Sequence, residues 1–373
     1  MKKLFKIVLL LIAGFFLTVG YLIFDRYRQT PEQVFPYPYA FNFTPDKITL
    51  EAPILLAGDR MGQYFSRFSD QIAETISVDL SKPIKIQSLA TDGQALHRTL
   101  HSLKSLAQWP QILVYQGGSE EFLERKFETE SMSTILNNIR LYKDDRIETF
   151  LILWPKLSRI VYSPHKRLVF SKEAKKAPAI SEEEYLKRLN TELLLYEQEL
   201  VQLVNMAKDR NTLLILTTTP LNLDVPPKKV CEFTTNIDVE KGIDTLKNYL
   251  KTSNPKVTYP YSSKLVAQFQ GNPDLYFLHA KAAEQYRRLD EAKKYYQMAS
   301  AYDCLQWRAN HLTNSIIKKV ASDQQVILFD FNQLVENDYG KNITFVDEIF
   351  PQNLYYEKGA NQLGKLIKQI LKL

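Results

Sequence analysis

The chain has 373 residues, 45% hydrophobic and 24% charged, so it can bury a core and is too apolar for a disordered protein. Lys and Arg outnumber Asp and Glu by 48 to 42, and Lys2, Lys3 and Lys6 supply half of the net charge of +6. The densest basic stretch, residues 166–176 (KRLVFSKEAKK), is typical of a solvated loop. This balance excludes the clustered basic stripe of a nucleic-acid-binding protein.

The cysteines and histidines do not fall into a metal-binding pattern. Cys231 and Cys304 form no ligand motif and no disulfide framework, and their spacing leaves open whether they pair. His97 and His101 stand four residues apart, which places both on one helix face, but the carboxylate of the HExxH zinc motif is missing. Two ordinary helix histidines are therefore favoured over a metal pair, and we expect no metal and no cofactor.

The amino terminus contains an uncharged run of 18 residues at positions 7–24 (IVLLLIAGFFLTVGYLIF). Its length predicts a transmembrane signal anchor rather than the apolar core of a signal peptide. No A-x-A cleavage site or lipobox cysteine follows, and a cleaved signal is the alternative. The positive-inside rule keeps residues 1–6 in the cytoplasm, which predicts that the globular part lies on the periplasmic or extracellular side of the cytoplasmic membrane.

Beyond the anchor, an extended tether rich in proline and aromatic residues is expected over residues 25–50. Apolar runs then predict strands at 54–57, 84–89, 111–115, 213–216 and 326–330. Amphipathic stretches predict helices at 63–77, up to 106, at 181–208 and at 359–373. This alternation is typical of an α/β protein with a doubly wound parallel sheet, which we place over residues 51–373.

Two insertions interrupt this rhythm. Residues 120–180 are irregular and are expected to form a helical insertion with the basic loop. Residues 272–302, which contain LDEAKKYYQMASAYD, predict two helices joined at Leu289 and Asp290, similar to one tetratricopeptide unit. A single unit cannot form a solenoid, so a structural insertion is favoured over a peptide-binding groove.

The stretch ILLAGDRMG, residues 54–62, is the candidate centre of the domain. Its apolar run breaks at Gly58 and continues into a predicted helix, which indicates a sharp strand-to-helix turn. Open α/β sheets place ligands and chemistry at the carboxyl ends of their strands. The side chain exposed on this turn is Arg60.

Four short blocks carry a family resemblance. Gly58-Asp59-Arg60 comes first, followed by Asp92-Gly93, then by residues 115–120 (YQGGSE) and 345–351 (FVDEIFP). In this order the chain resembles the SGNH (GDSL-type) hydrolases, and most of all the branch with a short tetratricopeptide-like insertion. The resemblance runs from residue 54 to the carboxyl terminus, and it implies a flavodoxin-like sheet with SGNH-hydrolase topology.

The resemblance also implies which residues would catalyse. Members of the family attack with a serine on the first turn, activated by a histidine and an aspartate, and hold the oxyanion with a glycine and an asparagine. This sequence keeps Gly93 and Asp347, but it has Arg60 for the serine, Ser119 for the asparagine and Phe350 for the histidine. Arginine cannot attack a carbonyl and phenylalanine accepts no proton, so we expect no catalytic residues.

Arg60 has two interpretations. A cation at a helix start opposes the helix dipole, so a carboxylate should hold it, with Asp347 expected first and Asp59 or Glu120 next. Alternatively, Arg60 and the Gly93 N–H bind an anionic group. The candidate binding residues are Arg60, Gly93, Gly117, Ser119, Glu120 and Asp347.

We therefore expect a membrane-anchored, catalytically inactive SGNH-like protein of the cell envelope that acts as a binding or scaffolding subunit. The resemblance implies acylated or anionic glycans as ligands and an acyltransferase as a partner, and no nucleic acid. The main alternative is an active esterase or acyltransferase with a non-standard nucleophile. An acid–base glycosidase using the carboxylates near the turn, and an interaction protein acting through residues 272–302, are further alternatives.

Overall fold

The computed structural model describes residues 2–77, 84–173, 175 and 181–371. Lys176 of the basic loop, the end of the first predicted insertion at 177–180, and the last two residues of the closing helix lie outside this part. The chain divides into two compact units. One comprises Met1–Ala40 and Phe127–Leu168, and the other comprises Phe41–Lys126 and Val169–Leu373.

A five-stranded sheet forms the centre of the larger unit. Its strands are β2 (Ile54–Gly58), β3 (Ile86–Ser88), β4 (Ile112–Gln116), β6 (Leu213–Thr217) and β7 (Ile327–Phe329). They pair in the order β3-β2-β4-β6-β7, and every pairing is parallel. The predicted parallel sheet is therefore present, although β3 and β7 are shorter than predicted.

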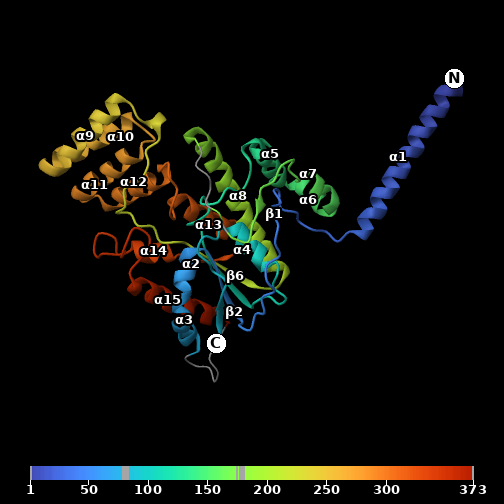
Figure 1. Ribbon diagram of the computed structural model, residues 1–373, viewed down its shortest axis with the longest axis horizontal. Coiled ribbons are helices and arrows are strands. Elements are labelled where there is room, and N and C mark those ends of the chain that lie inside the picture. The colour runs from blue at the N-terminus through green and yellow to red at the C-terminus, as the bar shows by residue number, and fades with distance from the viewer. Residues whose placement is uncertain (1, 78–83, 174, 176–180, 372–373) are drawn as a thin grey trace. The chain divides into compact units, whose positions relative to one another are not determined.

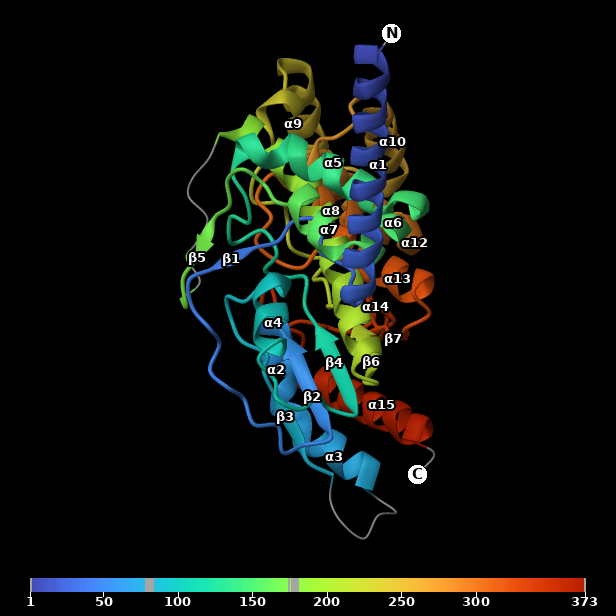
Figure 2. The ribbon, with the colours of Figure 1, turned by 90° about the vertical axis from the view of Figure 1, so that its right-hand side faces the viewer.

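Helices cover both faces of the sheet, as Figures 1 and 2 show. Successive strand residues point to opposite faces, so Leu55 packs in one apolar core and Ile54 and Leu56 pack in the other. The first core is closed by α4 (Leu96–Leu103), α8 (Glu182–Asp209) and α13 (His311–Asp323). The second is closed by α2 (Arg60–Phe65), η1 (Ser66–Phe68), α3 (Ser69–Ser77), α14 (Phe331–Glu336) and α15 (Asn353–Leu371). This is the doubly wound arrangement.

Four consecutive helices follow β6 and the short turn η3 (Glu232–Thr234): α9 (Ile237–Thr252), α10 (Pro255–Gln268), α11 (Pro273–Gln285) and α12 (Leu289–Tyr302). They share an apolar core of their own and cluster together in Figure 1, and we call them the four-helix insertion. The sequence patterns predict only α11 and α12. Pro260 lies inside α10, and proline usually marks the end of a helix, so this element escapes a pattern-based prediction.

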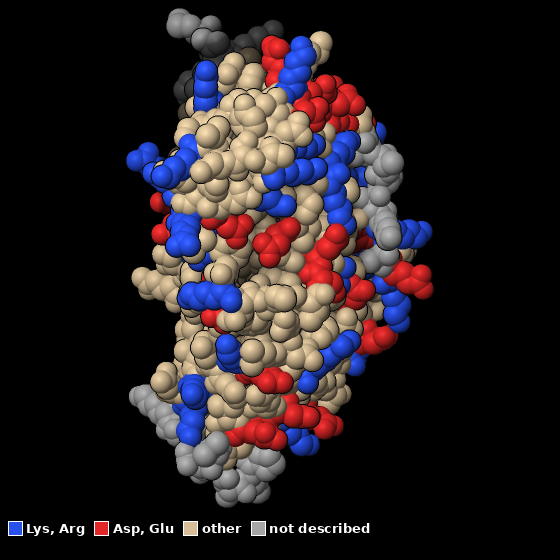
Figure 3. All heavy atoms as spheres, turned by 90° about the vertical axis from the view of Figure 1, so that its left-hand side faces the viewer, with Lys and Arg blue, Asp and Glu red and all other residues tan. Residues whose placement is uncertain are grey.

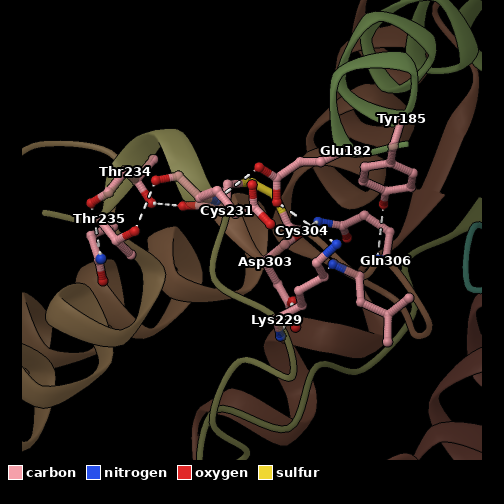
Figure 4. The surroundings of a disulfide bond; sticks show 12 residues. Glu182, Tyr185, Lys229, Cys231, Thr234, Thr235, Asp303, Cys304 and Gln306 are labelled. Carbon is pink, nitrogen blue, oxygen red and sulfur yellow. Dashed lines mark hydrogen bonds and ion pairs between the residues drawn. A yellow bond between two sulfur atoms is a disulfide. The ribbon is translucent and has the colours of Figure 1, made fainter. Parts of the chain in front are cut away.

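A disulfide closes the base of the four-helix insertion. Cys231 precedes α9 and Cys304 follows α12, 73 residues later, and their Cα atoms lie 5.6 Å apart. Figure 4 shows the surroundings of this bond. The Cys304 N–H donates to the carbonyl of Lys229, and the Asp303 carboxylate accepts the N–H groups of Lys228 and Lys229. The two chain segments that enter and leave the insertion are thus bonded to each other.

The smaller unit is helical. It contains α1 (Lys2–Arg28), the turn η2 (Thr129–Ser131), α5 (Met132–Tyr142), α6 (Asp145–Leu153) and α7 (Pro155–Val161). Two short strands, β1 (Ala40–Phe41) and β5 (Val169–Phe170), form a separate two-stranded sheet, and β5 belongs to the larger unit. Over Leu10–Arg28, α1 has a mean hydropathy of 1.5 and is long enough to cross a membrane. Length and composition fit a membrane anchor and a signal sequence equally, and they do not give the side of the membrane.

Candidate functional site

The turn after β2 is built by a glycine and an aspartate. Gly58 has a φ of +148°, and a Cβ at this position would lie 1.7 Å from the carbonyl oxygen of Gln116, so no other residue fits. Asp59 caps α2, since its Oδ1 accepts the Met61 N–H at 2.9 Å. Arg60 is therefore the first residue of α2. Because β3 and β4 flank β2, the loops that follow them reach the same edge of the sheet.

Ser119 is bonded to Asp59. The Oδ2 atom of Asp59 accepts both the N–H and the hydroxyl of Ser119, each at 2.7 Å, and both residues are buried. Burial raises the pKa of Asp59 to about 6, and the hydrogen bonds from Ser119 oppose this rise. Because the Ser119 hydroxyl is donated to Asp59, it is not free to donate to an oxyanion in this arrangement.

Glu120 occupies the backbone donors of the turn. Its Oε2 accepts the N–H of Gly93 at 2.8 Å and the N–H groups of Arg60 and Gln94 at 3.2 Å each. The resemblance assigns Gly93 to the oxyanion, and here a buried carboxylate of the chain itself receives the N–H of Gly93. We call this arrangement the Glu120 nest. The only sequence signal for it is a glutamate directly after Ser119.

The guanidinium of Arg60 lies over the same carboxylate. Its Nε is 3.6 Å from Oε1 of Glu120 and 3.9 Å from Oδ1 of Asp92. The Arg60 side chain is 24% exposed, and its Nε and Nη2 atoms have no hydrogen-bond partner among the described residues. A carboxylate therefore holds the cation, as expected, but the carboxylate is that of Glu120.

Asp347 is not the partner of Arg60, and that prediction is wrong. Its Oδ1 instead accepts the N–H groups of Ile349 at 2.7 Å and Phe350 at 2.6 Å, which closes a local turn. The ring of Phe350 lies 4.8 Å from the ring of Tyr64 on α2. Phe350 stands where the resemblance expects a histidine. It therefore lies close to the helix that begins at Arg60, and its ring contacts Tyr64.

The glutamate of the nest is held in an environment that favours its neutral form. Burial, followed by the negative charge of Asp59, raises the pKa of Glu120 to about 8, and Arg60 acts in the opposite direction.

Gly117, another candidate binding residue, offers its carbonyl to the Thr219 hydroxyl at 2.8 Å. Its observed role is thus in packing the loop that carries Glu120.

A small cavity borders the start of α2. It is lined by Met61, Pro220, Leu221, Asn222, Arg308, Ala309, Glu348 and Ile349, and its volume is about 10 Å³. That volume accommodates about one water molecule. Arg308 donates to the carbonyls of Asn222 and Val225, so its guanidinium stabilises the loop that contains these residues. This cavity is too small for a sugar or an acyl chain.

A buried charged triad supports the loop beyond Glu120. The Nζ of Lys126 lies 2.7 Å from Glu121 and 2.9 Å from Glu199 of α8, and all three side chains are fully buried. The second oxygen of Glu121 accepts the N–H of Leu96 at the start of α4. Breaking one partner of such a group is costly, so the triad fixes this loop to both helices.

The histidines at 97 and 101 go to different partners. His97 Nε2 lies 3.1 Å from Glu124, whose two oxygens also accept Arg98 at 2.7 and 2.6 Å. His101 Nε2 lies 3.0 Å from the carbonyl of Phe43. Both rings stack on Phe41, as their spacing on one face of α4 allows, but each histidine has its own hydrogen-bond partner.

A serine, a histidine and a glutamate contact one another within the four-helix insertion. The sequence patterns did not predict these contacts. The Ser262 hydroxyl lies 2.8 Å from His279 Nδ1, and His279 Nε2 lies 3.3 Å from Glu291. However, Ser262 is fully buried in the middle of α10, and its hydroxyl donates to the Tyr259 carbonyl. The helical N–H groups around it are already bonded, so no oxyanion site adjoins this hydroxyl.

Glu182 lies next to the disulfide (Figure 4). One ligand atom each from Glu182, Cys231 and Cys304 falls within 4.8 Å of the others, a grouping that could hold a metal if both sulfurs were free. The sulfurs are bonded to each other, so they offer no thiolate. The Glu182 carboxylate instead accepts the N–H of Glu232 at 2.7 Å.

No protein-family model matches the chain, and no curated protein matches its sequence. Among solved structures, it is similar to a GDSL-like lipase from Bacteroides thetaiotaomicron, with 10% identity, a TM-score of 0.35, and coverage of 85% of this chain and 88% of the other. It is also similar to a candidate acylhydrolase from Bacteroides fragilis, with 11% identity, a TM-score of 0.34, and coverage of 88% and 90%. These similarities are weak, and neither one assigns an activity.

Proposed function

We propose that this protein is a membrane-anchored, non-hydrolytic member of the SGNH fold group that serves as a binding or scaffolding subunit of the cell envelope. The observation that carries the proposal is the Glu120 nest. The N–H groups that would stabilise an oxyanion in a related hydrolase are bonded to the chain's own carboxylate.

The chemistry of the neighbouring positions supports the same proposal. Acyl transfer needs a nucleophile, a base that accepts its proton, and free donors for the oxyanion. Here the first position is Arg60, which is ion-paired with Glu120, and the second is Phe350, which packs on Tyr64. All three requirements fail at once, so hydrolysis by the family route is not expected.

The disulfide and α1 support an extracytoplasmic location. Structural disulfides persist in oxidising compartments and are rare in the cytosol. A bond between Cys231 and Cys304 therefore agrees with an anchor that keeps residues 1–6 inside and the folded part outside.

The ligand and the partner extend the proposal further. From the resemblance, an acylated or anionic glycan is the ligand class, and an acyltransferase is the partner. Arg60, whose side chain is 24% exposed, is the cation that would meet an anionic group. The Gly93 N–H would not take part, because Glu120 already receives it.

Labelling with a fluorophosphonate tests the proposal. The full-length protein in detergent is incubated with the probe and its intact mass is measured. We expect no adduct, because no described serine combines an accessible hydroxyl with a base and oxyanion donors. The Ser262→Ala and Ser315→Ala variants serve as controls, since the hydroxyls of these two serines lie 2.8 Å and 3.4 Å from a histidine nitrogen. A stoichiometric adduct on the wild type would overturn the proposal, and its loss in one of these variants would locate the nucleophile.

A further inference from the structure

Exposed apolar side chains gather on α6 and α7. Ile160 is 72% exposed and Phe150 is 48% exposed, and Leu157 is also exposed. Leu157 and Ile160 stand three residues apart on α7, which places them on one side of that helix. Phe150 lies at the end of α6, with its ring 4.5 Å from that of Trp154, the residue joining the two helices. Packing against the rest of this unit leaves these apolar side chains exposed to water.

Basic side chains flank these apolar ones. Lys156 and Arg159 lie on the exposed part of α7, and Arg146 is exposed on α6. Apolar and aromatic residues bordered by Lys and Arg are the composition of helices that lie in the headgroup region of a bilayer. The whole set, which we call the α6–α7 surface, consists of Arg146, Phe150, Lys156, Leu157, Arg159 and Ile160.

The α6–α7 surface is bonded to the end of α1. Lys156 Nζ forms an ion pair of 2.6 Å with Asp25, and its backbone N–H donates to Gln29. Glu32 pairs with Arg159, and the Glu32 N–H donates to the Ile152 carbonyl at 3.2 Å. The chain leaving α1 is therefore bonded to α6 and α7 directly after the helix ends. Figure 1 shows the chain running from α1 to these helices.

The position of Asp25 sets the distance of this surface from the membrane. Asp25 directly follows the uncharged run at residues 7–24, and a helix advances about 1.5 Å per residue. If the run spans the bilayer, Asp25 lies at the boundary between hydrocarbon and water. Lys156, bonded to Asp25, must lie at the same level.

We propose that the α6–α7 surface rests in the headgroup region of the membrane that holds α1. Arg146 and the exposed parts of Lys156 and Arg159, which also pair with Asp25 and Glu32, would face anionic lipids. This proposal depends on the membrane anchoring proposed above. The apolar side chains would enter the bilayer by about 5–10 Å, and the cations would meet lipid phosphates. Two contacts with the bilayer would then fix the orientation of α5, α6 and α7, which a single helix would leave free to rotate.

A depth-sensitive quenching experiment tests the proposal on the full-length protein. Both native cysteines are bonded to each other, so a single introduced cysteine can be labelled with a fluorophore. Ile160→Cys reports on the α6–α7 surface, Ile343→Cys is the control at a comparably exposed isoleucine, and Phe16→Cys reports on α1. Each labelled protein is reconstituted into vesicles of phosphatidylcholine and phosphatidylglycerol whose acyl chains carry bromine.

We expect strong quenching at position 16, and quenching at position 160 that exceeds that at position 343 by about twofold or more. A larger share of phosphatidylglycerol should increase the effect at position 160. Quenching at position 16 with equal signals at 160 and 343 overturns the proposal while leaving the anchor intact, and the surface would then face a protein or a second copy. Absence of quenching at position 16 overturns the anchoring, and the proposal fails with it.

Discussion

Glu120 supplies, from within the chain, the hydrogen-bond acceptor that a catalytic turn of this kind would reserve for a reacting group. Three backbone N–H groups and one guanidinium surround its carboxylate. An internal carboxyl group in such a nest satisfies buried donors that would otherwise be left unpaired. The turn therefore needs no ligand to satisfy its donors, which agrees with the non-hydrolytic role proposed above.

The titration of Glu120 predicts how stability depends on pH. Its pKa rises from an ordinary value of 4.5 to about 8, chiefly through burial, so the folded state holds the proton more tightly than the unfolded state. The resulting stabilisation is fully present below pH 4.5 and is lost as the pH rises through 8. We expect the thermal midpoint to fall over this range, and Glu120→Gln, which cannot titrate, to flatten the decline.

Differential scanning fluorimetry between about pH 5 and 9 measures this slope. Glu357→Gln, which neutralises an exposed carboxylate of α15, is the matched control and should keep the wild-type slope. Parallel curves for the wild type and Glu120→Gln would contradict the assignment. Asp59 and Glu192, whose pKa values burial raises to about 6 and about 7, should leave a residual slope in every variant.

At the scale of elements, the four-helix insertion is the part of the larger unit that depends most on a covalent bond. The disulfide joins the two ends of a stretch of 73 residues. In the chain-entropy treatment, closing a loop of this length stabilises the folded state by about 4 kcal/mol. The helices α9 to α12 have their own core, so the loss of the bond should act on them first.

We therefore predict that Cys231→Ser/Cys304→Ser lowers the thermal midpoint and speeds hydrogen exchange in α9 to α12. The amides of β2 and β4 should keep their protection, because those strands lie at the centre of the sheet. Exchange followed by mass spectrometry, with the oxidised wild type as the reference, measures both. Unchanged exchange in the insertion, or equal losses in β2 and β4, would contradict this prediction.

The elements that the sequence predicts are those with a strong local signal. The buried strands β2, β4 and β6 are apolar runs, and Ser181 caps α8 as its position before three glutamates suggests. The juxtaposition of Gly93 and Glu120 with the turn after β2 follows from parallel strand order. The sequence does not predict which carboxylate pairs with Arg60. Whether Asp347 or Glu120 reaches Arg60 depends on how the two loops that carry them fold, and these loops are far apart in the sequence.

Other features depend on tertiary packing and leave no local pattern. Cys231 and Cys304 are brought together by the folding of the insertion between them, so their spacing carries no information about pairing. Pro260 hides α10. Ser262 and His279 come from two different helices, and nothing in the sequence around either one marks their contact.

At the scale of the whole molecule, the larger unit combines a five-stranded parallel sheet with an insertion that a disulfide closes at its base, and the smaller unit carries the apolar helix. Figure 3 shows one face on which basic and acidic side chains are intermixed, so this face presents no broad field of one sign. Recognition there would depend on local shape and individual pairs. These features agree with the binding or scaffolding role proposed above.

The central claim is that Glu120 fills the donor nest of the turn, and a rescue experiment tests it most directly. Glu120→Ala removes the acceptor of three N–H groups and the partner of Arg60, which should lower the free energy of unfolding by about 2–4 kcal/mol. Acetate can enter the vacated nest and stabilise the variant by mass action. We predict that acetate raises the thermal midpoint of Glu120→Ala, relative to chloride at equal ionic strength, and leaves the wild type unchanged. Equal responses of the two proteins, or none in the variant, would contradict the account.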